Sequence, residues 1–415
     1  MKEALHRTFE QIFSEKNKIL TFSFMITYNE ALEILYNIKQ TLNTENIALQ
    51  NAVGRTLATD IFADTDLPPF NKSAMDGYAC RKQDLKNELF VIETIKAGYV
   101  PQKIVTENTC SKIMTGAMIP QGADCVIIVE ETEILANNKI RFGGEKTSQN
   151  IIFQAEDLKK GEKILSAGEI LKPQHIAVLA MVGIHNPLVY KRPTVAVVTT
   201  GSELVEPENT PTISQIRNSN AWQLIAQLQQ LNIPSKYFGI VADNENDLKK
   251  SIQTAEKECD ITILTGGVSM GDFDLVPKIL VDCGYHIHFH KIAVQPGKPV
   301  LFAQNNHKFC FGLPGNPVSA FTAFETLVKP FLHLFSGNYN KPQDILLPFS
   351  ENYSRKKNNR LLWLPVKITQ NNEVETINYH GSAHINALTV ANGLAIIPLG
   401  KSDFKKGEQV YVRQI

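Results

Sequence analysis

The chain has 415 residues, 43% hydrophobic and 20% charged, which is the composition of a soluble globular protein too long for a single core. Its 42 Lys and Arg residues balance its 42 Asp and Glu residues, which argues against a nucleic-acid-binding protein because such proteins carry a basic excess. No apolar stretch approaches the roughly 20 residues of a membrane span, which argues against a membrane protein.

The cysteines and the N-terminal residues give two expectations about the context of the protein. The six cysteines are scattered and form no CxxC pair, which favours a reducing cytoplasm where thiols act as small hydrophobic side chains. Residues 1–24 are mixed in charge and lack a cleavage-site pattern, so they do not resemble a signal peptide; in the expected domain division the N-terminal extension is residues 1–25. We expect Met25 to be the natural start, and the leader to be an artefact of the assigned start or a poorly ordered N-terminal extension.

The first half of the chain combines helical and β patterns. Thr27 is expected to cap an amphipathic helix at residues 28–42. A Pro-rich, non-helical segment follows at 60–70, and Asn137-Asn138 has the pattern of a hairpin turn. Residues 169–183 favour a helix with Pro173 near its start and Gly183 at its end. Strands are predicted between these helices at residues 91–95, 112–114, 125–129 and 139–142.

From residue 194 the pattern changes to strands alternating with helices. Such alternation predicts a parallel sheet with helices on both faces. The expected strands are residues 194–199, 236–241, 260–264 and 286–293, and the expected helices are residues 221–231, 245–257 and 275–283. After residue 337 the chain is β-rich again, with strands of a small barrel predicted at residues 361–368, 373–377, 393–398 and 409–412.

The most informative motif is GLPGNP at residues 312–317. Its prolines fix φ and its glycines permit conformations closed to other residues, so the turn is both stiff and tight. A hydrophobic segment precedes it at 308–311 and an apolar-periodic run follows it at 319–334. This pattern predicts a strand, a rigid turn and a helix N-terminus whose N–H groups favour anions. The alternative is a strand–helix connector without a ligand.

Three further motifs follow apolar runs or lie between them. They are TTGSEL at 199–204, TGGVSMGDFD at 265–274 and QPGKP at 295–299. Small or polar residues at strand ends are typical of an open α/β sheet, which binds ligands beyond the carboxyl ends of its strands. Glu203, Asp243 and Asp274 all fall just after predicted strands, with Asp272 as a rival. Converging carboxylates suit Mg²⁺, whereas a single one is more often a loop cap.

Together with SAMDGYA at 73–79 and IMTGA at 113–117, these motifs resemble, in order and spacing, the molybdopterin molybdenumtransferases of the MoeA type, relatives of the gephyrin C-terminal domain. The resemblance extends from Met25 to the C-terminus. It implies an α/β multidomain protein with a central doubly wound, mostly parallel α/β domain that binds molybdopterin. The expected parts are an N-terminal/linker domain containing a helix (26–62 plus 157–192), a β-rich inserted domain (63–156), the α/β domain (193–337) and a C-terminal small β-barrel (338–415). The pairing of residues 46–62 with 157–192 comes from the resemblance alone.

The implied activity is the insertion of molybdate into adenylylated molybdopterin, with Mg²⁺, which releases AMP and molybdenum cofactor. The resemblance also implies a homodimer whose site is shared between subunits, and complexes with molybdopterin adenylyltransferase and molybdenum apoenzymes. A non-catalytic molybdopterin-binding scaffold and a tungstate-using paralogue stay open as alternatives. The retained acidic residues favour catalysis, and the length of the chain together with Asp76 argues against an adenylyltransferase.

The motifs of the family assign roles to individual residues. Metal ligands are expected at Glu203, Asp243 and Asp274, and these three together with Asp76, Thr115 and Asp157 form the expected catalytic set. The resemblance implies that Asp76, Thr115 and Asp157 reach the site from the second subunit. Around Asp157 the chain has QAED where many relatives have a basic, Gly-containing stretch, so Glu156 is a second candidate. The expected cofactor-binding positions are Gly266, Gly267, Ser269, Lys291, Lys298, Pro299, Pro314, Gly315, Asn316, Pro317, Ser319, Arg360 and Ser382.

Molybdate is a dianion, and cationic hydrogen-bond donors are its strong partners. Lys298, Ser319, Arg360 and Ser382 match the anion pocket of the family, and Lys291 matches a further basic position. Gln295 stands where many relatives have lysine, so we expect weaker molybdate binding than in a relative with that lysine. His286, His288 and His290 alternate along a predicted strand, and we favour a polar sheet face over a native metal site there.

Overall fold

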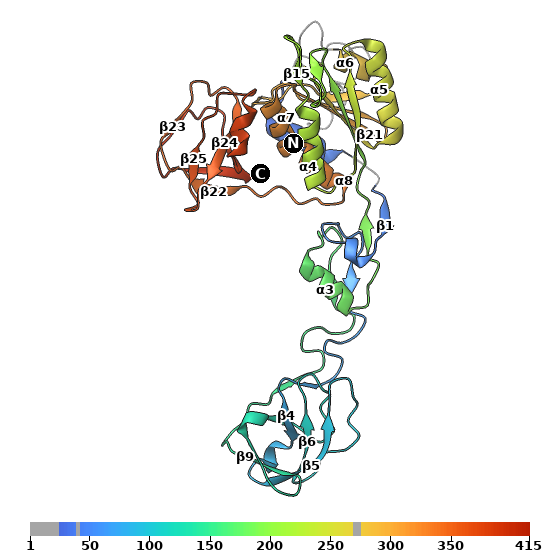
Figure 1. Ribbon diagram of the computed structural model, residues 1–415, viewed down its shortest axis with the longest axis vertical. Helices are drawn as coiled ribbons and strands as arrows, with labels where there is room; N and C mark the ends of the chain where they lie inside the picture. Colours follow the sequence, from blue (N-terminus) through green and yellow to red (C-terminus); the bar gives the residue numbers. More distant parts are fainter. Residues whose placement is uncertain (1–24, 39–41, 269–274) are drawn as a thin grey trace, which may run out of the picture. The chain divides into compact units, whose positions relative to one another are not determined.

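The computed structural model describes residues 25–38, 42–268 and 275–415. It divides into two compact units, one formed by residues 46–189 and the other by the remaining described residues (Figure 1). The predicted N-terminal extension lies outside the described residues, apart from Met25. No helix in the described ranges is both long and apolar enough to cross a membrane.

The larger unit is built on a six-stranded sheet with the strand order β16-β13-β17-β21-β20-β18. The strands are β16 (Ser235–Val241), β13 (Val195–Thr200), β17 (Ile261–Thr265), β21 (Lys308–Leu313), β20 (Leu301–Asn305) and β18 (His286–Phe289). The pairs β16–β13, β13–β17 and β17–β21 are parallel, whereas β20 is antiparallel to both of its neighbours. The expected mostly parallel sheet is confirmed, but β18 ends at Phe289 rather than at Ala293.

Helices cover both faces of this sheet. Val195 and Val197 face a core shared with α4 (Asn220–Gln230) and with the helical run α7 (Pro317–Ala323), η5 (Phe324–Val328) and α8 (Lys329–Phe335). Ala196 and Val198 face the opposite core. That core contains α5 (Glu245–Glu258) and α6 (Val276–Asp282), which lie together in Figure 1. Neighbouring residues of β13 thus enter opposite cores, as the two-residue period of a strand requires.

The N-terminal helix α2 (Tyr28–Asn37) belongs to the core of the larger unit. Thr27 caps it as predicted, because the Glu30 N–H donates to Thr27 Oγ1 at 3.2 Å and the Thr27 N–H donates to Glu30 Oε2 at 2.7 Å. The predicted extension to Leu42 is wrong, since Ile38 is already extended. Tyr28, Ala31 and Leu35 pack in the core of the α/β sheet, although the resemblance groups this helix with residues 157–192 in one domain.

The C-terminal part of the larger unit is a small barrel, as predicted. Its strands are β22 (Ile345–Pro348), β24 (Leu361–Ile368), β25 (Val374–Thr376), β26 (Gly393–Ile397) and β28 (Gln409–Gln414). They form the path β25-β24-β26-β28-β22, and a bridge between Phe349 and Val374 joins its ends. The short strand β19 (Val294–Gln295) adds to the beginning of β24. Part of the QPGKP motif is therefore built onto the barrel.

The smaller unit contains a six-stranded sheet with the order β7-β4-β6-β5-β9-β8. Asn137 and Asn138 have φ values of 59° and 61° and join the last two strands, which confirms the predicted hairpin turn. Gly77 is required in this sheet, because a Cβ there would lie 1.8 Å from Ile127 O. The strands are β7 (Cys125–Ile128), β4 (Gly77–Cys80), β6 (Thr109–Ile113), β5 (Glu88–Ile95), β9 (Lys139–Phe142) and β8 (Thr132–Ile134).

A second core in the smaller unit joins segments that are distant in sequence. Strand β2 (Ile61–Phe62) pairs with β11 (Lys163–Leu165), and Leu57 forms a bridge with Val189. Residues 46–62 therefore pair with the segment after 157, as the resemblance implied. Helix α3 (Pro173–Met181) completes this core, and it begins at Pro173 rather than at Glu169. The precise domain boundaries stay predictions.

Candidate functional site

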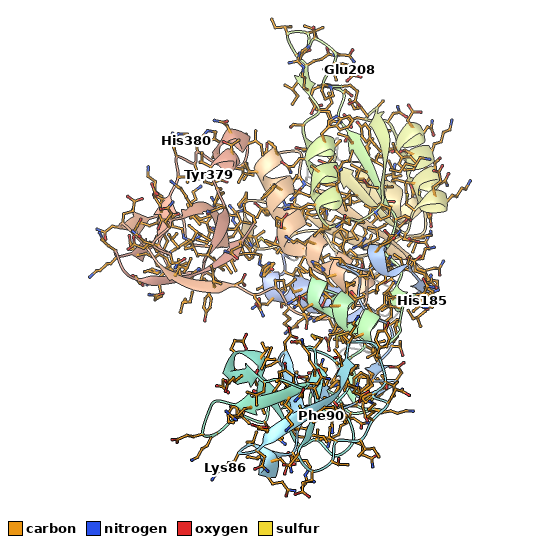
Figure 2. All side chains as sticks on the ribbon, turned by 60° about the horizontal axis from the view of Figure 1, so that its bottom comes forward. Lys86, Phe90, His185, Glu208, Tyr379 and His380 are labelled. Atoms are coloured by element: carbon orange, nitrogen blue, oxygen red, sulfur yellow. The ribbon has the colours of Figure 1, made fainter. Side chains whose placement is uncertain are left out.

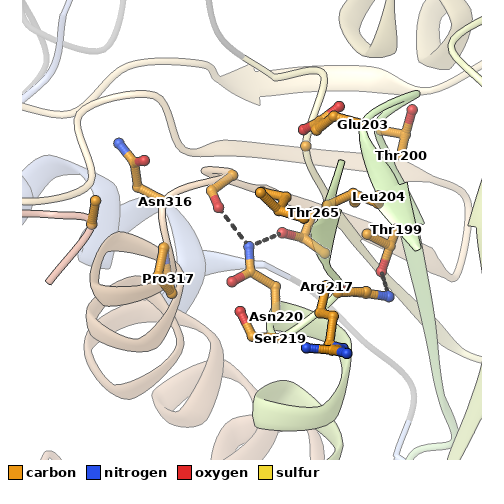
Figure 3. A pocket seen from close by; sticks show the side chains of 15 residues that line it. Thr199, Thr200, Glu203, Leu204, Arg217, Ser219, Asn220, Thr265, Asn316 and Pro317 are labelled. Carbon is orange, nitrogen blue, oxygen red and sulfur yellow. Dashed lines mark hydrogen bonds between the residues drawn. The ribbon is translucent and has the colours of Figure 1, made fainter. Parts of the chain in front are cut away.

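A pocket of about 360 Å³ lies at the carboxyl ends of β13, β17 and β21 (Figure 3). Four of the predicted cofactor-binding residues line it, namely Gly266, Gly315, Asn316 and Pro317, together with the predicted metal ligand Glu203. Ala383, from the HGSAH segment of the C-terminal barrel, also lines it. The pocket is where the sheet topology predicts a ligand site, with one wall supplied by the barrel.

Asn220 joins two of the loops that form the pocket. Its Nδ2 donates to Thr265 Oγ1 at 2.9 Å and to Gly315 O at 2.8 Å (Figure 3). The Thr265 hydroxyl in turn donates to Pro314 O at 3.4 Å. The end of β17 and the GLPGNP turn are therefore fastened together by one buried amide. Asn220 is not among the predicted site residues, although the run Asn218-Ser219-Asn220 directly before a predicted helix was a signal.

Gly266 and Gly267 allow the loop after β17 to approach the loop after β13. Their φ values are +93° and +60°, and a Cβ on Gly266 would lie 2.1 Å from Thr200 O. A side chain at Gly266 would therefore separate the two loops. The predicted ligand-binding residue Ser269 and the carboxylates Asp272 and Asp274 lie outside the described residues.

Asp243 fixes the TTGSEL turn. Thr200 Oγ1 donates to its Oδ1, and Ser202 donates to its Oδ2 through the backbone N–H at 2.9 Å and the hydroxyl at 3.2 Å. The Glu203 carboxylate folds over the same turn, because a Cβ on Gly201 would lie 2.8 Å from Glu203 Oε2. Of the two predicted metal ligands that the structure describes, Glu203 thus belongs to this turn, and Asp243, from the loop after β16, is bonded to it. Within the described ranges, no three His, Cys, Asp or Glu residues are clustered for a metal.

The QPGKP segment and Arg360 are held against each other. Arg360 Nη1 donates to Val294 O at 3.2 Å, and the backbone N–H of Leu361 donates to Ala293 O at 3.1 Å. Gly297 packs against the Ser319 carbonyl, which an added Cβ would approach to 3.5 Å. Arg360 and Ser319, which are predicted to bind the oxyanion, thus flank the segment that carries Lys298.

These oxyanion residues differ in exposure. Lys298 is exposed, Lys291, Gln295 and Arg360 are half-buried, and Ser319 is only 3% exposed. Of the two predicted prolines, Pro299 is half-buried and Pro314 is buried. Lys291 also anchors the N-terminal segment, because its carbonyl accepts a hydrogen bond from the Ile26 N–H at 3.1 Å.

Ser382 connects the barrel to the GLPGNP turn. Its carbonyl accepts a hydrogen bond from the Val318 N–H at 3.0 Å, and its Oγ accepts one from Asn316 Nδ2 at 3.0 Å. Tyr379 and His380, labelled in Figure 2, precede it in the same segment. The predicted helix N-terminus therefore has one N–H bound to protein, because Val318 lies in the first turn of α7.

Asp76 and Thr115 form a direct pair in the smaller unit. Asp76 Oδ1 accepts hydrogen bonds from the Thr115 backbone N–H at 2.6 Å and from its hydroxyl at 2.8 Å. These bonds, the backbone one first, lower the pKa of Asp76 from its ordinary value. The two predicted catalytic residues from SAMDGYA and IMTGA thus lie together, and Asp76 is held as a carboxylate.

Asp157 lies in an exposed turn of the smaller unit. Its backbone N–H donates to Leu67 O at 2.9 Å. The neighbouring Glu156 accepts a hydrogen bond from the Phe153 N–H at 2.7 Å through Oε2, so it caps its own turn. This contact favours Asp157 over Glu156 for the predicted catalytic role.

The three alternating histidines divide into two groups. His286 and His288 lie on the edge strand β18 with ring centroids 4.9 Å apart, and His288 Nε2 is 3.2 Å from Gln304 Oε1. His290 is only 8% exposed, and its Nε2 is 2.9 Å from Val268 O. His290 therefore supports Val268 in the TGGVSMGDFD motif, a role that the alternating pattern did not indicate.

A doubly wound sheet with ligand loops at its carboxyl edge, fastened to a small barrel, defines the class of cofactor-binding α/β proteins. Three family descriptions match the chain: the MoeA N-terminal region (domain I and II) over residues 26–183, the probable molybdopterin binding domain over 196–334, and the MoeA C-terminal region (domain IV) over 351–415.

Known proteins match almost the whole chain. The molybdopterin molybdenumtransferase of Staphylococcus aureus strain Mu50 is 35% identical over 93% of this chain and 94% of its own length. That of Staphylococcus epidermidis strain RP62A is 36% identical over 93% and 95%. The crystal structure of the molybdopterin biosynthesis MoeA protein from Pyrococcus horikoshii superimposes with a TM-score of 0.80 and 30% identity, covering 94% of this chain and 99% of that one. The chain belongs to the MoeA family.

Proposed function

We propose that this protein is a molybdopterin molybdenumtransferase of molybdenum cofactor biosynthesis, and that it inserts molybdate into adenylylated molybdopterin with release of AMP. Its curated relatives carry this enzyme name over almost the entire chain. The observation that carries the detailed reaction is that Arg360 is bonded to the QPGKP segment, Gly297 of that segment packs against the Ser319 carbonyl, and Ser382 is bonded to the GLPGNP turn, which lines the pocket. These are separate segments of the sequence, and each contributes a group suited to an anionic ligand.

The site divides into two regions with different chemistry. The pocket of about 360 Å³ presents hydroxyl, amide and backbone groups from Thr199, Ser219, Asn220 and the two glycine-containing loops, which suits a polar heterocycle and its phosphate. Arg360, Lys298, Ser319 and Ser382 supply the cationic and hydroxyl donors that a tetrahedral dianion requires. Molybdate would be held by this second group next to the dithiolene of the molybdopterin.

Mg²⁺ suits the carboxylates at the edge of the sheet. Glu203 in the TTGSEL turn and Asp243, which is bonded to that turn, offer hard oxygen donors, and Asp274 is the expected third ligand. Asp243 Oδ1 accepts one hydrogen bond, from Thr200, and keeps a lone pair for a metal ion, whereas Oδ2 accepts two bonds from Ser202. When bound there, the ion would neutralise phosphate charge on the nucleotide.

Asp76, Thr115 and Asp157 belong to the smaller unit, and we propose that they complete the site of a second subunit in a homodimer. The carboxylate of Asp76, oriented by Thr115, would act on the nucleotide or on metal-bound water. We further propose a cytoplasmic location, and complexes with molybdopterin adenylyltransferase and with molybdenum apoenzymes, since the cofactor has to be received and delivered.

A single-turnover assay tests the reaction. Purified protein is mixed with adenylylated molybdopterin, Mg²⁺ and molybdate, and AMP and active cofactor are both followed. We expect AMP release that depends on molybdate and is lost in Asp274→Ala and Glu203→Gln. Tight binding without AMP release would instead indicate a carrier or scaffold, and a preference for tungstate in the same assay would indicate the tungstate-using alternative.

Subunit mixing tests the shared site. Asp76→Asn and Glu203→Gln should each abolish activity as pure homodimers. If each site combines Asp76 of one subunit with Glu203 of the other, a 1:1 mixture after subunit exchange should regain about a quarter of the wild-type activity, because half of the dimers would carry one intact site. A mixture that stays inactive after proven exchange would contradict the shared site.

A further inference from the structure

The loop at residues 355–360 contains two arginines with different surroundings. Both are half-buried, and both belong to the cationic stretch SRKKNNR before β24. The resemblance assigns only Arg360 to the anion pocket, although by its chemistry either guanidinium would suit an oxyanion. Their hydrogen bonds do separate them.

Arg355 is bound to three backbone carbonyls. Its Nε donates to Lys401 O at 2.8 Å, its Nη1 to Arg360 O at 3.0 Å, and its Nη2 to Pro398 O at 2.7 Å. A guanidinium has five N–H donors in a rigid planar fork, and here each of its three nitrogens is directed at a different carbonyl. Arg355 therefore fastens the loop to the turn at residues 398–401 through two bonds, and its third bond holds the carbonyl of Arg360 at the end of the loop.

Arg360 continues the connection toward the α/β domain. Its Nη1 donates to Val294 O at 3.2 Å, directly before Gln295 in the QPGKP segment. The adjacent backbone is paired as well, since Leu361 N–H donates to Ala293 O and Val294 is the strand partner of Leu361. A continuous path of hydrogen bonds thus runs from the barrel turn through Arg355 and Arg360 to the segment that carries Lys298.

We propose that Arg355 is a positioning residue for oxyanion binding: it holds the backbone of Arg360 so that the Arg360 guanidinium and the QPGKP segment share one fixed geometry. This inference rests on the proposed function, in which Arg360 contacts molybdate. Arg355 contributes through geometry rather than by contact with the anion, because each of its three nitrogens is bound to a backbone carbonyl of the barrel.

Arg355→Lys tests this role because it keeps the positive charge and removes the planar guanidinium group with its divergent N–H donors. An ammonium group has three donors on one atom and cannot reach three carbonyls arranged around a planar guanidinium. We expect the KM for molybdate to rise about tenfold, since misplacing a binding group by a fraction of an ångström has effects of this order. The dissociation constant for adenylylated molybdopterin, measured without molybdate, should stay within twofold of wild type.

Two matched variants separate positioning from charge and from stability. Asn358→Ala removes the bonds from Asn358 Nδ2 to Gly400 O at 3.1 Å and to Ser402 Oγ at 2.8 Å, which fasten the same loop to the same turn without touching Arg360. Lys356→Met removes an exposed neighbouring charge. Both should keep the wild-type KM for molybdate, although Asn358→Ala should lower the melting temperature as Arg355→Lys does.

The outcomes separate the inference from the function on which it rests. If Arg360→Ala raises the KM for molybdate and Arg355→Lys does not, the positioning role is wrong and the oxyanion site stands. If Arg360→Ala has no effect on that KM, the placement of molybdate itself is wrong. An equal increase in Asn358→Ala and Arg355→Lys would reduce Arg355 to general support of the loop and overturn the proposal.

Discussion

Asn316 Nδ2 donates a hydrogen bond to Ser382 Oγ at 3.0 Å, which joins the GLPGNP turn of the α/β domain to the C-terminal barrel. Which of the two groups donates this hydrogen bond matters for ligand binding by Ser382. Because the Ser382 oxygen accepts the hydrogen of Asn316, the Ser382 hydroxyl proton is not used in this contact and can be donated to a ligand. The amide thus orients a hydroxyl that we expect to bind molybdate.

Substitutions of Asn316 should therefore weaken oxyanion binding, and by different amounts. Asn316→Ala removes the orientation and should raise the KM for molybdate a few-fold, as expected for an exposed neutral hydrogen bond of about 1 kcal/mol. Asn316→Asp should be worse, above tenfold, because a carboxylate would accept the Ser382 proton and repel a dianion. Steady-state kinetics with varied molybdate measures both, and an Asp variant no worse than the Ala variant would contradict this direction.

Two glycines of the pocket should respond differently to alanine. At Gly266, φ is +93° and the new Cβ would meet Thr200 O at 2.1 Å, so Gly266→Ala should lower the melting temperature and abolish binding of adenylylated molybdopterin. At Gly315 nothing lies within 4 Å of the new Cβ. Gly315→Ala should keep the stability of wild type, so any loss of binding there reports contact with the ligand alone. Calorimetric melting and nucleotide binding should be measured on both variants, and a stable Gly266→Ala would contradict the close approach.

The pair of Asp76 and Thr115 gives a prediction about ionisation. The pKa of Asp76 lies below its ordinary value because of the two bonds from Thr115, and Thr115→Val removes only the hydroxyl bond. The pKa of Asp76 should therefore rise in this variant, but not fully to the ordinary value. A depressed carboxyl pKa stabilises the fold above the unfolded-state pKa, and this contribution is lost as the pH falls through the folded-state pKa. Carboxyl-carbon NMR titration of wild type and Thr115→Val measures the change, and an unchanged pKa would show that the backbone bond alone controls it.

Local patterns predicted the elements of this fold well, because the causes of those elements are local. The strands of the α/β sheet follow from apolar runs, α2 from the capping pair Thr27 and Glu30, and the hairpin from Asn137-Asn138. The end of α2 was predicted wrongly because the amphipathic pattern of the sequence continues past Asn37, whereas the helical backbone ends there. The core that this helix joins could not be predicted, since its apolar face does not specify which other elements it packs against.

The candidate site was predicted where motifs mark strand ends, and it was missed where contacts join distant segments. Asn220 bonds to Thr265 and Gly315, and Arg355 bonds to Pro398 and Lys401, so neither role follows from neighbouring residues. The antiparallel strand β20 and the addition of β19 to β24 are likewise pairings between segments separated by loops. The structure also separates Arg355 from Arg360, which sequence chemistry alone treats as equivalent.

A buried ion pair should decide the stability of the barrel. Arg413 is 8% exposed, and it binds Asp344 through two bonds of 2.8 and 3.0 Å beneath the Trp363 ring, 4.9 Å from its centroid. Asp344→Asn leaves the buried cation with a neutral partner and should lower the free energy of unfolding by about 2–3 kcal/mol. Arg413→Met should cost less, because the Asp344 side chain is 22% exposed and can be solvated.

Urea unfolding followed by tryptophan fluorescence measures this difference, since Trp363 lies in the contact. The double variant Asp344→Asn/Arg413→Met should be more stable than Asp344→Asn alone, because no buried charge is left without its partner. If the two effects are instead additive, the ion pair does not contribute to stability as a pair.

Gln295→Lys should strengthen molybdate binding. Gln295 is half-buried on β19 beside the carbonyl of Val294 that Arg360 binds, and its neighbour in the barrel strand is Leu362. A lysine there adds a Coulomb attraction that the neutral amide lacks, worth on the order of 1 kcal/mol for a pair that stays well solvated, or about fivefold in affinity. Isothermal titration with molybdate should therefore give a lower dissociation constant for Gln295→Lys, and Gln295→Met should bind more weakly than wild type because it also loses the amide donors.

The salt dependence of binding is the control. The gain in molybdate affinity from lysine should be smaller at high salt than at low salt, because salt screens a Coulomb attraction but does not alter an effect of side-chain shape. Equal or weaker binding by Gln295→Lys at low salt would place Gln295 outside the reach of the oxyanion, and molybdate would then lie closer to Ser382 than to the QPGKP segment.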